Sequence, residues 1–459
     1  MALTTNGTQA PTPAVDPILD PQRTYELDRK HVFHSWSAQG KIRPMTITAA
    51  RGSYVWDAEG NALLDFSSQL VYTNIGHQHP KVIAGIQDQA ARLCTIAPQH
   101  ANDARSEAAR LIAERTPGDL DKVFFTNGGA DANEHAVRMA RLHTGRRKVL
   151  SRYRSYHGGT DTAVNLTGDP RRWPSDYGDA GVVHFFGPYL YRSRFHATTE
   201  QEECDRALAH LEEVIRMEGP STIAAILLET IPGTAGMMIP PPGYLRGVRE
   251  LCDRYGIVFI ADEVMAGFGR AGEWFAVARD GVTPDLITFA KGVTSGYVPL
   301  GGVAISAEIA ATFDQQAYPG GLTYSGHPLA AGAAVATINA MQDEGVVEHA
   351  AMIGQDHLGP ALRDLAERHP SVGEVRGTGV FWAVELVRDR TTREPLAPYA
   401  GSSEAMDAVL PACKERGLLP MISANRVHMV PPCTVSPEEV REATGILDEV
   451  LTVVDEAIA

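Results

Sequence analysis

The stretch GIVFIADE, residues 256–263, decides the expected fold class, because it is a nearly continuous apolar run that ends in two carboxylates. Two runs of the same kind lie before and after it, TIAAILLE (222–229) and DLITFAK (285–291), and segments long enough for helices separate the three. Strands that are apolar along their whole length are buried on both faces, and parallel strands need crossover connections. The sequence therefore predicts an α/β protein whose large, mostly parallel sheet is sandwiched between helices.

The same alternation begins further upstream and changes towards the C-terminus. KVFFTN (122–127) and KVLSRY (148–153) are further strand-like runs, and a long helical stretch covers residues 330–370. Isolated apolar strands and a final helix follow, which is typical of a smaller α+β domain. The predicted division is a flexible N-terminal arm (1–21), a further N-terminal segment (22–75) that is expected to pack with the small domain, a large domain (76–334) and a small C-terminal domain (335–459).

Charge and cysteine content restrict the classes of function. The 459 residues carry 41 basic and 56 acidic side chains, and this net charge of −15 argues against nucleic acid or an anionic membrane as a partner. No apolar stretch reaches the roughly 20 residues that a membrane-spanning helix needs. The five cysteines have no CxxC spacing, so we expect reduced thiols and no metal site. The first residues lack the features of a signal peptide. We therefore expect a cytoplasmic protein.

Lys291 is the first candidate for chemistry, because it closes a buried strand. An ammonium group in such a place must be paired or neutralised. Desolvation lowers the pKa of a lysine, so that its free amine becomes available as a nucleophile. A structural alternative is a salt bridge from Lys291 to Asp262 or Glu263, at the end of the preceding run. The residue alone leaves both interpretations open.

Two turns after predicted strands offer the remaining parts of a ligand site. Gly128, Gly129 and Ala130 lie between a strand and a helix, where free backbone N–H groups suit a phosphate, although a plain turn has the same composition. Tyr156, next to His157, also follows a strand, and its ring either stacks on a flat ligand or packs in the core. The sequence contains no Walker A, G-x-G-x-x-G, H-E-x-x-H or G-x-S-x-G motif, which removes the corresponding standard hypotheses.

A lysine, a strand-end aspartate, a glycine turn and a stacking tyrosine are together the groups needed to hold pyridoxal phosphate. This cofactor binds lysine as a Schiff base, while a carboxylate keeps its pyridine nitrogen protonated. From about residue 25 to its end, the chain closely resembles the class III (ω-type) aminotransferases, which include ω-amino acid/amine:pyruvate and taurine:pyruvate aminotransferases and have the type I pyridoxal-phosphate transferase fold. The motifs that carry the resemblance are FFTNGGADANEHAVRMAR (124–141), YRSYHGG (153–159), DEVMAGFGR (262–270), TFAKGVTSGYVPLGG (288–302) and LTYSGHP (322–328).

The resemblance implies a role for each matching residue. Lys291 carries the cofactor as an internal aldimine and then moves the proton between the substrate carbon and the cofactor's C4′. Asp262 pairs with the pyridinium nitrogen, and His157 supports Asp262. The remaining implied contacts are Tyr156 and Val264 on the two ring faces, Gly128, Gly129 and Ala130 at the phosphate, Glu229 beside the ring, and Thr323 at the phosphate of a neighbouring subunit. The implied assembly is a homodimer or tetramer with its active site at the dimer interface.

The chain departs from the family where the substrate binds. The expected substrate pocket consists of Trp36, Val71, Tyr72, Tyr156 and Arg426. Val71 stands at the position of the family's pocket tryptophan. Met421 lies near the position of the mobile arginine that binds the substrate carboxylate in many relatives, and Arg426 follows five residues later. Either Arg426 or another donor therefore binds the acid, or recognition of the carboxylate is weak.

The expected function is that of an aminotransferase with small-molecule substrates. It moves an amino group from a primary amine or ω-amino acid (β-alanine, taurine or an arylalkylamine) to pyruvate or a similar 2-oxo acid, by a ping-pong mechanism through aldimine and ketimine intermediates. Two alternatives stay open: a decarboxylase or aminomutase with the same cofactor, and a catalytically silent cofactor-binding protein. Product formation without a keto acid would indicate the first, and failure of an added amine to discharge the cofactor's yellow colour would indicate the second.

Overall fold

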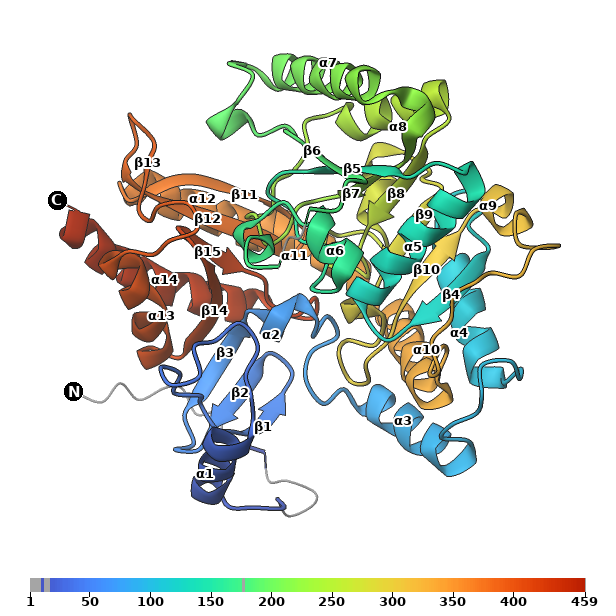
Figure 1. Cartoon of the computed structure of the whole chain (residues 1–459). Coiled ribbons are helices and arrows are strands. Elements are labelled where there is room, and N and C mark those ends of the chain that lie inside the picture. The colour runs from blue at the N-terminus through green and yellow to red at the C-terminus, as the bar shows by residue number, and fades with distance from the viewer. Residues whose placement is uncertain (1–9, 12–16, 176–177, 459) are drawn as a thin grey trace.

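The computed structural model describes residues 10–11, 17–175 and 178–458, and two sheets organise these residues (Figure 1). The first sheet has seven strands in the order β4-β10-β9-β8-β7-β5-β6. All of them run parallel except β10, which is antiparallel to both of its neighbours. The strands are β4 (Lys122–Thr126), β5 (Lys148–Arg152), β6 (Val182–Phe185), β7 (Ile223–Glu229), β8 (Val258–Asp262), β9 (Leu286–Phe289) and β10 (Gly301–Ile305). The predicted large, mostly parallel sheet is confirmed.

Helices cover both faces of this sheet, as its apolar strands require. In β7, Ala225 and Leu227 pack with side chains of α5, whereas Ile226 and Leu228 enter a separate cluster with α8. Successive side chains of a strand point to opposite faces, so a wholly apolar strand serves two cores at once. On one face lie α5 (Gly129–Thr144), α6 (Asp161–Leu166) and α9 (Ala307–Ala311), and on the other α3 (Pro80–Arg92), α4 (Asp103–Ala113), α7 (Glu200–Glu218), α8 (Tyr244–Tyr255) and α10 (Pro328–Asp343).

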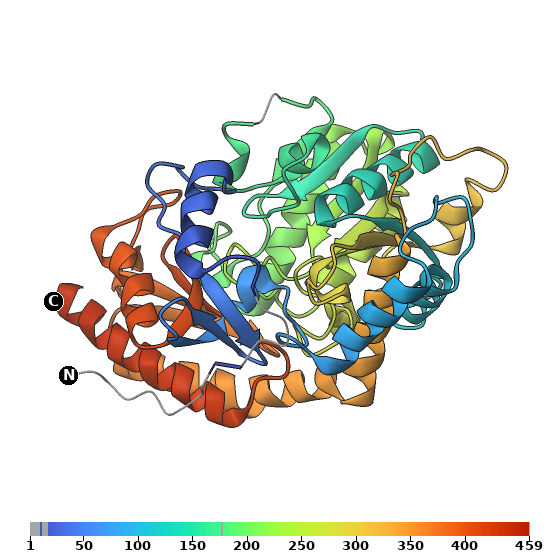
Figure 2. The same cartoon turned by 90° about the horizontal axis from the view of Figure 1, so that it is seen from below.

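The second sheet joins the two ends of the chain, in the order β1-β2-β3-β14-β15-β12-β11 with β13 paired to β12. The parallel pairing of β3 with β14 places blue strands beside red ones in Figure 1. Helices α12, α13 and α14 pack against this sheet, and Figure 2 shows α14 along the outer side of the molecule. The elements are β1 (Ile47–Arg51), β2 (Tyr54–Asp57), β3 (Ala62–Phe66), β11 (Val372–Thr378), β12 (Phe381–Asp389), β13 (Glu394–Pro395), β14 (Leu418–Ser423), β15 (Arg426–Met429), α12 (Gly359–Arg368), α13 (Glu404–Glu415) and α14 (Pro437–Ile458). This pairing supports the proposed packing of residues 22–75 with a small domain of residues 335–459.

The helical stretch expected at residues 330–370 is divided. After α10, Gly345 has φ = +60°, a left-handed conformation that glycine adopts without strain, and the chain then forms α11 (Val346–Ile353). A π-helical turn at Gly354–Leu358 precedes α12. The predicted arm, residues 1–21, lies mostly outside the described residues, and its last residue is the first residue of α1 (Pro21–His31).

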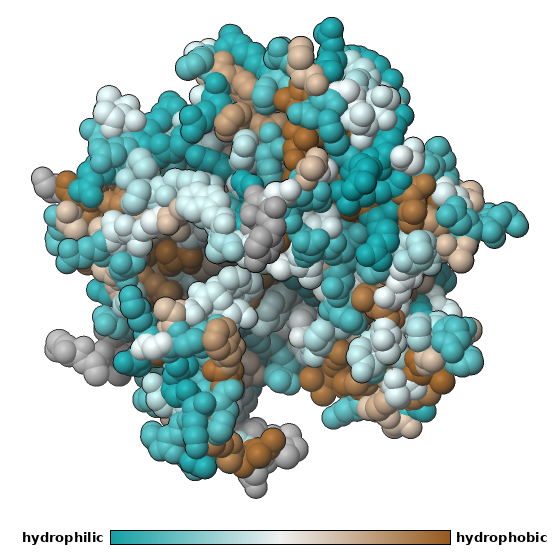
Figure 3. Space-filling view, viewed as in Figure 1, coloured by the Kyte–Doolittle hydropathy of each residue, from teal (hydrophilic) through white to brown (hydrophobic). Residues whose placement is uncertain are grey.

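The outer surface is largely hydrophilic, with a hollow that contains apolar residues on the face seen in Figure 3. In the part of the chain that the structure describes, no helix is both long and apolar enough to cross a membrane. Four of the five cysteines are buried, and all five are free thiols.

Candidate active site

The predicted site residues gather at one edge of the large sheet, where its parallel strands end. Glu229 and Asp262 are the last residues of β7 and β8, and Lys291 follows β9. Open parallel sheets bind ligands at this edge, in the crevice outside the carboxyl ends of the strands. A cavity of about 370 Å³ lies here, and the predicted residues that line it are Tyr72, Gly128, Gly129, Ala130, Tyr156, His157, Glu229, Asp262, Val264 and Lys291.

The Asp262 carboxylate is buried and fixed by three donors. His157 Nδ1 and Asn133 Nδ2 donate to Asp262 Oδ2 at 2.7 and 2.9 Å, and the Val264 N–H donates to Oδ1 at 3.0 Å. Ser151 Oγ lies 3.1 Å from His157 Nε2, at the far side of the imidazole. A carboxylate oxygen accepts about two hydrogen bonds. Asp262 Oδ1, with this single donor among the described residues, therefore keeps capacity for a protonated ring nitrogen.

Asn133 completes this network, and the sequence interpretation missed it. It lies on α5, where it also donates to the carbonyl of His157 at 2.8 Å and accepts from Thr288 Oγ1 at 2.8 Å. These contacts connect α5 to strands β8 and β9 and to the loop after β5. The only signal in the sequence is a polar residue among small and apolar ones on the buried side of that helix.

Lys291 lines the cavity without the salt bridge that the structural alternative requires. The Asp262 carboxylate is engaged as described, and Glu263 turns away to accept from Thr230 Oγ1 at 2.6 Å and from two backbone N–H groups. Among the described residues, neither carboxylate forms an ion pair with Lys291. Burial lowers the pKa of Lys291 to about 8, although nearby carboxylates oppose this effect. Its amine is therefore much closer to neutrality at physiological pH than that of an ordinary lysine.

The glycine turn at the N-terminus of α5 leaves room for an anion. No side chain caps this helix, and a Cβ added at Gly128 would meet no described atom within 4 Å. At Gly129, by contrast, a Cβ would lie 2.7 Å from Val264 Cγ1, so this glycine allows Val264 to pack closely. Free N–H groups and the helix dipole make such a terminus suitable for a phosphate.

Glu229 and Arg171 hold the tyrosine of the site from two sides. Glu229 Oε1 accepts from the Tyr156 N–H at 2.9 Å, and Oε2 accepts from the Gly233 N–H at 2.9 Å. Burial raises the pKa of Glu229. The Arg171 guanidinium lies 3.5 Å from the centroid of the Tyr156 ring and pairs with Asp169. Tyr156 thus lines the cavity instead of packing in the core.

A second cavity, of about 500 Å³, adjoins the first, because Tyr156, Met265 and Lys291 line both. Trp36 and Arg426 also line it. The structure therefore brings two predicted pocket residues from distant parts of the chain to the space next to Lys291.

Two predicted residues are absent from the described lining of both cavities. Val71 has φ = +60° and is buried in an apolar cluster that includes Phe381, while its neighbour Leu70 lines the second cavity. The kinked backbone at this point turns Val71 inward. Thr323 is exposed and lies away from the cavities of its own chain.

Comparison with known proteins identifies the family. The family model for aminotransferase class-III matches residues 36–451. Putrescine–pyruvate aminotransferase of Pseudomonas aeruginosa is 34% identical over 406 residues, which cover 86% of this chain and 88% of that protein. Taurine:2-oxoglutarate aminotransferase from Bifidobacterium kashiwanohense, solved in complex with PLP and glutamate, is 41% identical with a TM-score of 0.94, covering 97% of this chain and 100% of that one. An (S)-enantioselective omega-transaminase from Thermomicrobium roseum is 36% identical with a TM-score of 0.89, covering 94% and 98%.

The chain belongs to the class III aminotransferases. The predicted family, the type I fold and the activity of an aminotransferase are thereby confirmed.

Proposed function

We propose that the active site of this pyridoxal-phosphate-dependent aminotransferase is the pair of cavities around Lys291. The first cavity offers what the cofactor needs: backbone N–H groups at the start of α5 for the phosphate, an acceptor on Asp262 for the ring nitrogen, and the Lys291 amine. When bound, pyridoxal phosphate supplies an aldehyde that exchanges amines and a ring that withdraws electrons from the substrate carbon.

The side chains of the first cavity have separate tasks in this proposal. Lys291, with its pKa of about 8, takes up and releases a proton near neutral pH, as a general acid and base must. Asp262 is held in position by His157 and Asn133, so no reorganisation is needed when a ring binds. Glu229 fixes the backbone at Tyr156 and thereby the aromatic wall.

The second cavity takes the substrates. Trp36, Leu70 and Met265 give it apolar walls, and Arg426 adds a cation. We propose as donor a primary amine or ω-amino acid of the β-alanine, taurine or arylalkylamine class, and as acceptor pyruvate or a similar 2-oxo acid. Relatives named as putrescine–pyruvate and taurine:2-oxoglutarate aminotransferases support these classes.

The active unit in this proposal is a homodimer or tetramer in the cytoplasm. Thr323 is exposed, as expected for a residue that reaches the phosphate of a partner subunit. The free thiols are in keeping with a reducing compartment. Sedimentation of the cofactor-loaded protein as a monomer would contradict the dimer.

The observation that carries the proposed function is the position of Lys291 in the lining of both cavities, with a lowered pKa and with no ion pair to any described residue. The test is transfer of an amino group from a panel of primary amines to pyruvate or 2-oxoglutarate by the cofactor-loaded protein. Lys291→Ala should abolish turnover. Lys122→Ala should retain it, because Lys122 is the first residue of β4 and therefore lies at the other edge of the sheet from Lys291. Steady-state transfer by the Lys291 variant would contradict the proposal.

A further inference from the structure

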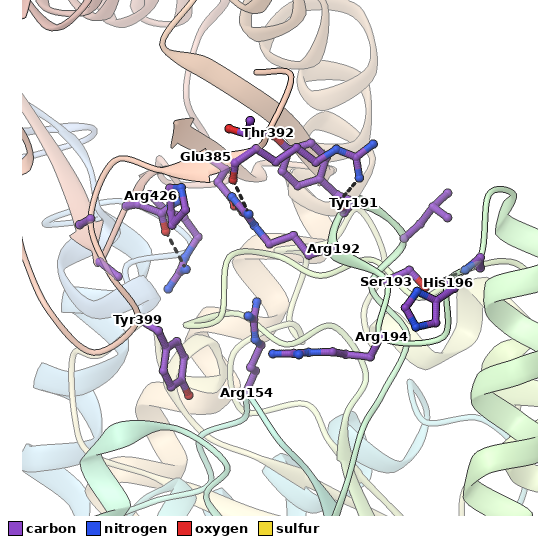
Figure 4. A pocket seen from close by; sticks show the side chains of 17 residues that line it. Arg154, Tyr191, Arg192, Ser193, Arg194, His196, Glu385, Thr392, Tyr399 and Arg426 are labelled. Carbon is purple, nitrogen blue, oxygen red and sulfur yellow. Dashed lines mark hydrogen bonds and ion pairs between the residues drawn. The ribbon is translucent and has the colours of Figure 1, made fainter. Parts of the chain in front are cut away.

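The substrate cavity continues into a third space. A cavity of about 690 Å³ lies beyond it, and Arg154, Tyr399, Ala424 and Arg426 line both. The arginine cavity, as we call this third space, is drawn in Figure 4. Through the shared residues it is continuous with the space next to Lys291, so one ligand can extend from Lys291 towards it.

The arginine cavity has a strong excess of positive charge. Its charged lining consists of Arg154, Arg192, Arg194, Arg393, Arg426 and Glu385. Glu385 is already neutralised, because Arg192 Nε donates to it at 2.8 Å and Arg376 Nη2 lies 2.9 Å from it. The cavity therefore offers cations but no free carboxylate in its described lining.

Three arginines line the substrate cavity, and Arg171 among them pairs with Asp169, which leaves Arg154 and Arg426 for the substrate. In the described part of the chain, neither forms an ion pair with a carboxylate. The hydrogen bonds of the Arg426 guanidinium go to Asn425 Oδ1, Ser423 Oγ and the Thr234 carbonyl, at 3.3, 3.3 and 3.5 Å. These distances are at the long limit for hydrogen bonds, and the acceptors are neutral.

The surroundings of both arginines favour an incoming anion. The Arg426 Nε is buried without any partner in the described structure, and burial together with nearby Arg376 and Arg154 lowers the pKa of Arg426 to about 10. Arg154 forms no ion pair with any carboxylate of the described residues, and its guanidinium lies over the rings of Tyr189 and Tyr399 at 5.4 and 5.6 Å. In Figure 4 the Arg154 and Arg426 side chains extend from opposite walls into the same space. A buried cation without a counterion is costly, and a bound carboxylate removes that cost.

We propose that Arg154 and Arg426 bind the distal carboxylate of a dicarboxylic 2-oxo acid, and of the amino acid formed from it, at the junction of the substrate and arginine cavities. This inference rests on the proposed function and narrows the acceptor from small 2-oxo acids in general to those with a second carboxylate. Guanidinium groups bind carboxylates in a planar, charge-assisted geometry, which gives both strength and selectivity. Because Arg171 is already paired with Asp169, Arg154 and Arg426 are the arginines of the substrate cavity that remain for a carboxylate.

The first test compares two acceptors with one amine donor in the cofactor-loaded protein. We expect kcat/KM for 2-oxoglutarate to exceed that for pyruvate at least tenfold, and Arg154→Met or Arg426→Met to reduce this ratio at least tenfold. Arg426→Lys, which keeps the charge but not the planar fork, should fall between. Arg254→Met is the matched control, because Arg254 is exposed on α8 and pairs with Glu212, and it should leave the ratio unchanged. Equal kcat/KM values for the two acceptors in the wild-type protein would overturn the inference.

The second test needs no turnover. Calorimetric titration of the loaded wild-type protein should give a Kd for glutarate at least tenfold lower than that for butyrate, and both Met variants should lose this difference. Equal Kd values for the two acids in the wild-type protein contradict the inference even if a variant folds poorly. If glutarate binding depends on Arg426 but no donor supports amino transfer, the proposed function fails while the carboxylate site stands. If transfer occurs but glutarate binds equally to the wild-type protein and all variants, the carboxylate site fails alone.

Discussion

Replacement of Lys291 by methionine should stabilise the protein when it is free of cofactor. At pH 7 the amine is protonated in the folded and the unfolded chain, and the folded chain bears the cost of burying that charge. The pKa falls from 10.5 to about 8 because of burial, which corresponds to about 3 kcal/mol as an upper value, since the side chain keeps some exposure. Methionine has a similar length and no charge, so it fills the same space without this cost.

The lowered pKa of Lys291 also determines how the stability difference between the two proteins changes with pH. Between pH 8 and 10.5 the unfolded chain binds more protons at this site than the folded one, so the wild-type protein gains stability with rising pH and the variant does not. We expect the variant to melt a few degrees higher than the wild-type protein near pH 7 and the two to converge near pH 10. The measurement is thermal melting of both apo-proteins across this range, with Lys122→Met as the control. A variant that is less stable at pH 7, or a difference that does not change with pH, would refute the reasoning.

Three substitutions test the remaining parts of the site. Gly128→Val should weaken binding of pyridoxal phosphate by roughly tenfold or more but leave the melting temperature of the apo-protein nearly unchanged, because a side chain there enters open space. An unchanged affinity for pyridoxal phosphate in a titration would contradict the phosphate site. Gly158→Ala should instead destabilise the fold itself, since φ is +140° and its Cβ would lie 2.5 Å from the Ala130 Cβ; a melting temperature equal to that of the wild-type protein would show the packing to be wrong. Asn133→Leu should lower the free energy of unfolding in urea by about 1–3 kcal/mol, because Asp262 loses a buried donor. An unchanged free energy of unfolding would show that Asn133 does not stabilise this network.

The large sheet could be predicted from the sequence because its strands are apolar throughout, and this pattern depends only on burial from two sides. Strand β10 was not anticipated. Its sequence GGVAI (301–305) begins with two glycines, which weaken a strand signal, although the structure needs them: a Cβ at Gly302 would lie 2.5 Å from the Phe289 ring. That close contact between neighbouring strands is not encoded in local sequence.

Some residues of the candidate site could likewise be predicted from the sequence, and others could not. Lys291 and Asp262 were recognisable because ionisable groups at the ends of buried strands are rare. Asn133 was missed because its partners, Asp262 and Thr288, lie more than a hundred residues away, and nothing nearby in the sequence indicates a buried network. The inward turn of Val71 depends on backbone conformation, which a motif comparison does not include.

The arginine cavity could not be predicted from the sequence either. Arg154 lies inside the motif YRSYHGG, yet its importance comes from Arg426 on the opposite wall, and only the folded chain brings these two residues to one space.

The central claim is that Lys291 is the residue to which the cofactor attaches. The most direct measurement is borohydride reduction of the protein loaded with pyridoxal phosphate, followed by digestion and mass spectrometry. We predict one modified site, on the peptide that contains Lys291, and no modification when the protein has first been treated with an excess of an amine donor. Modification of a different lysine, or an unmodified Lys291 peptide in the loaded protein, would contradict the account.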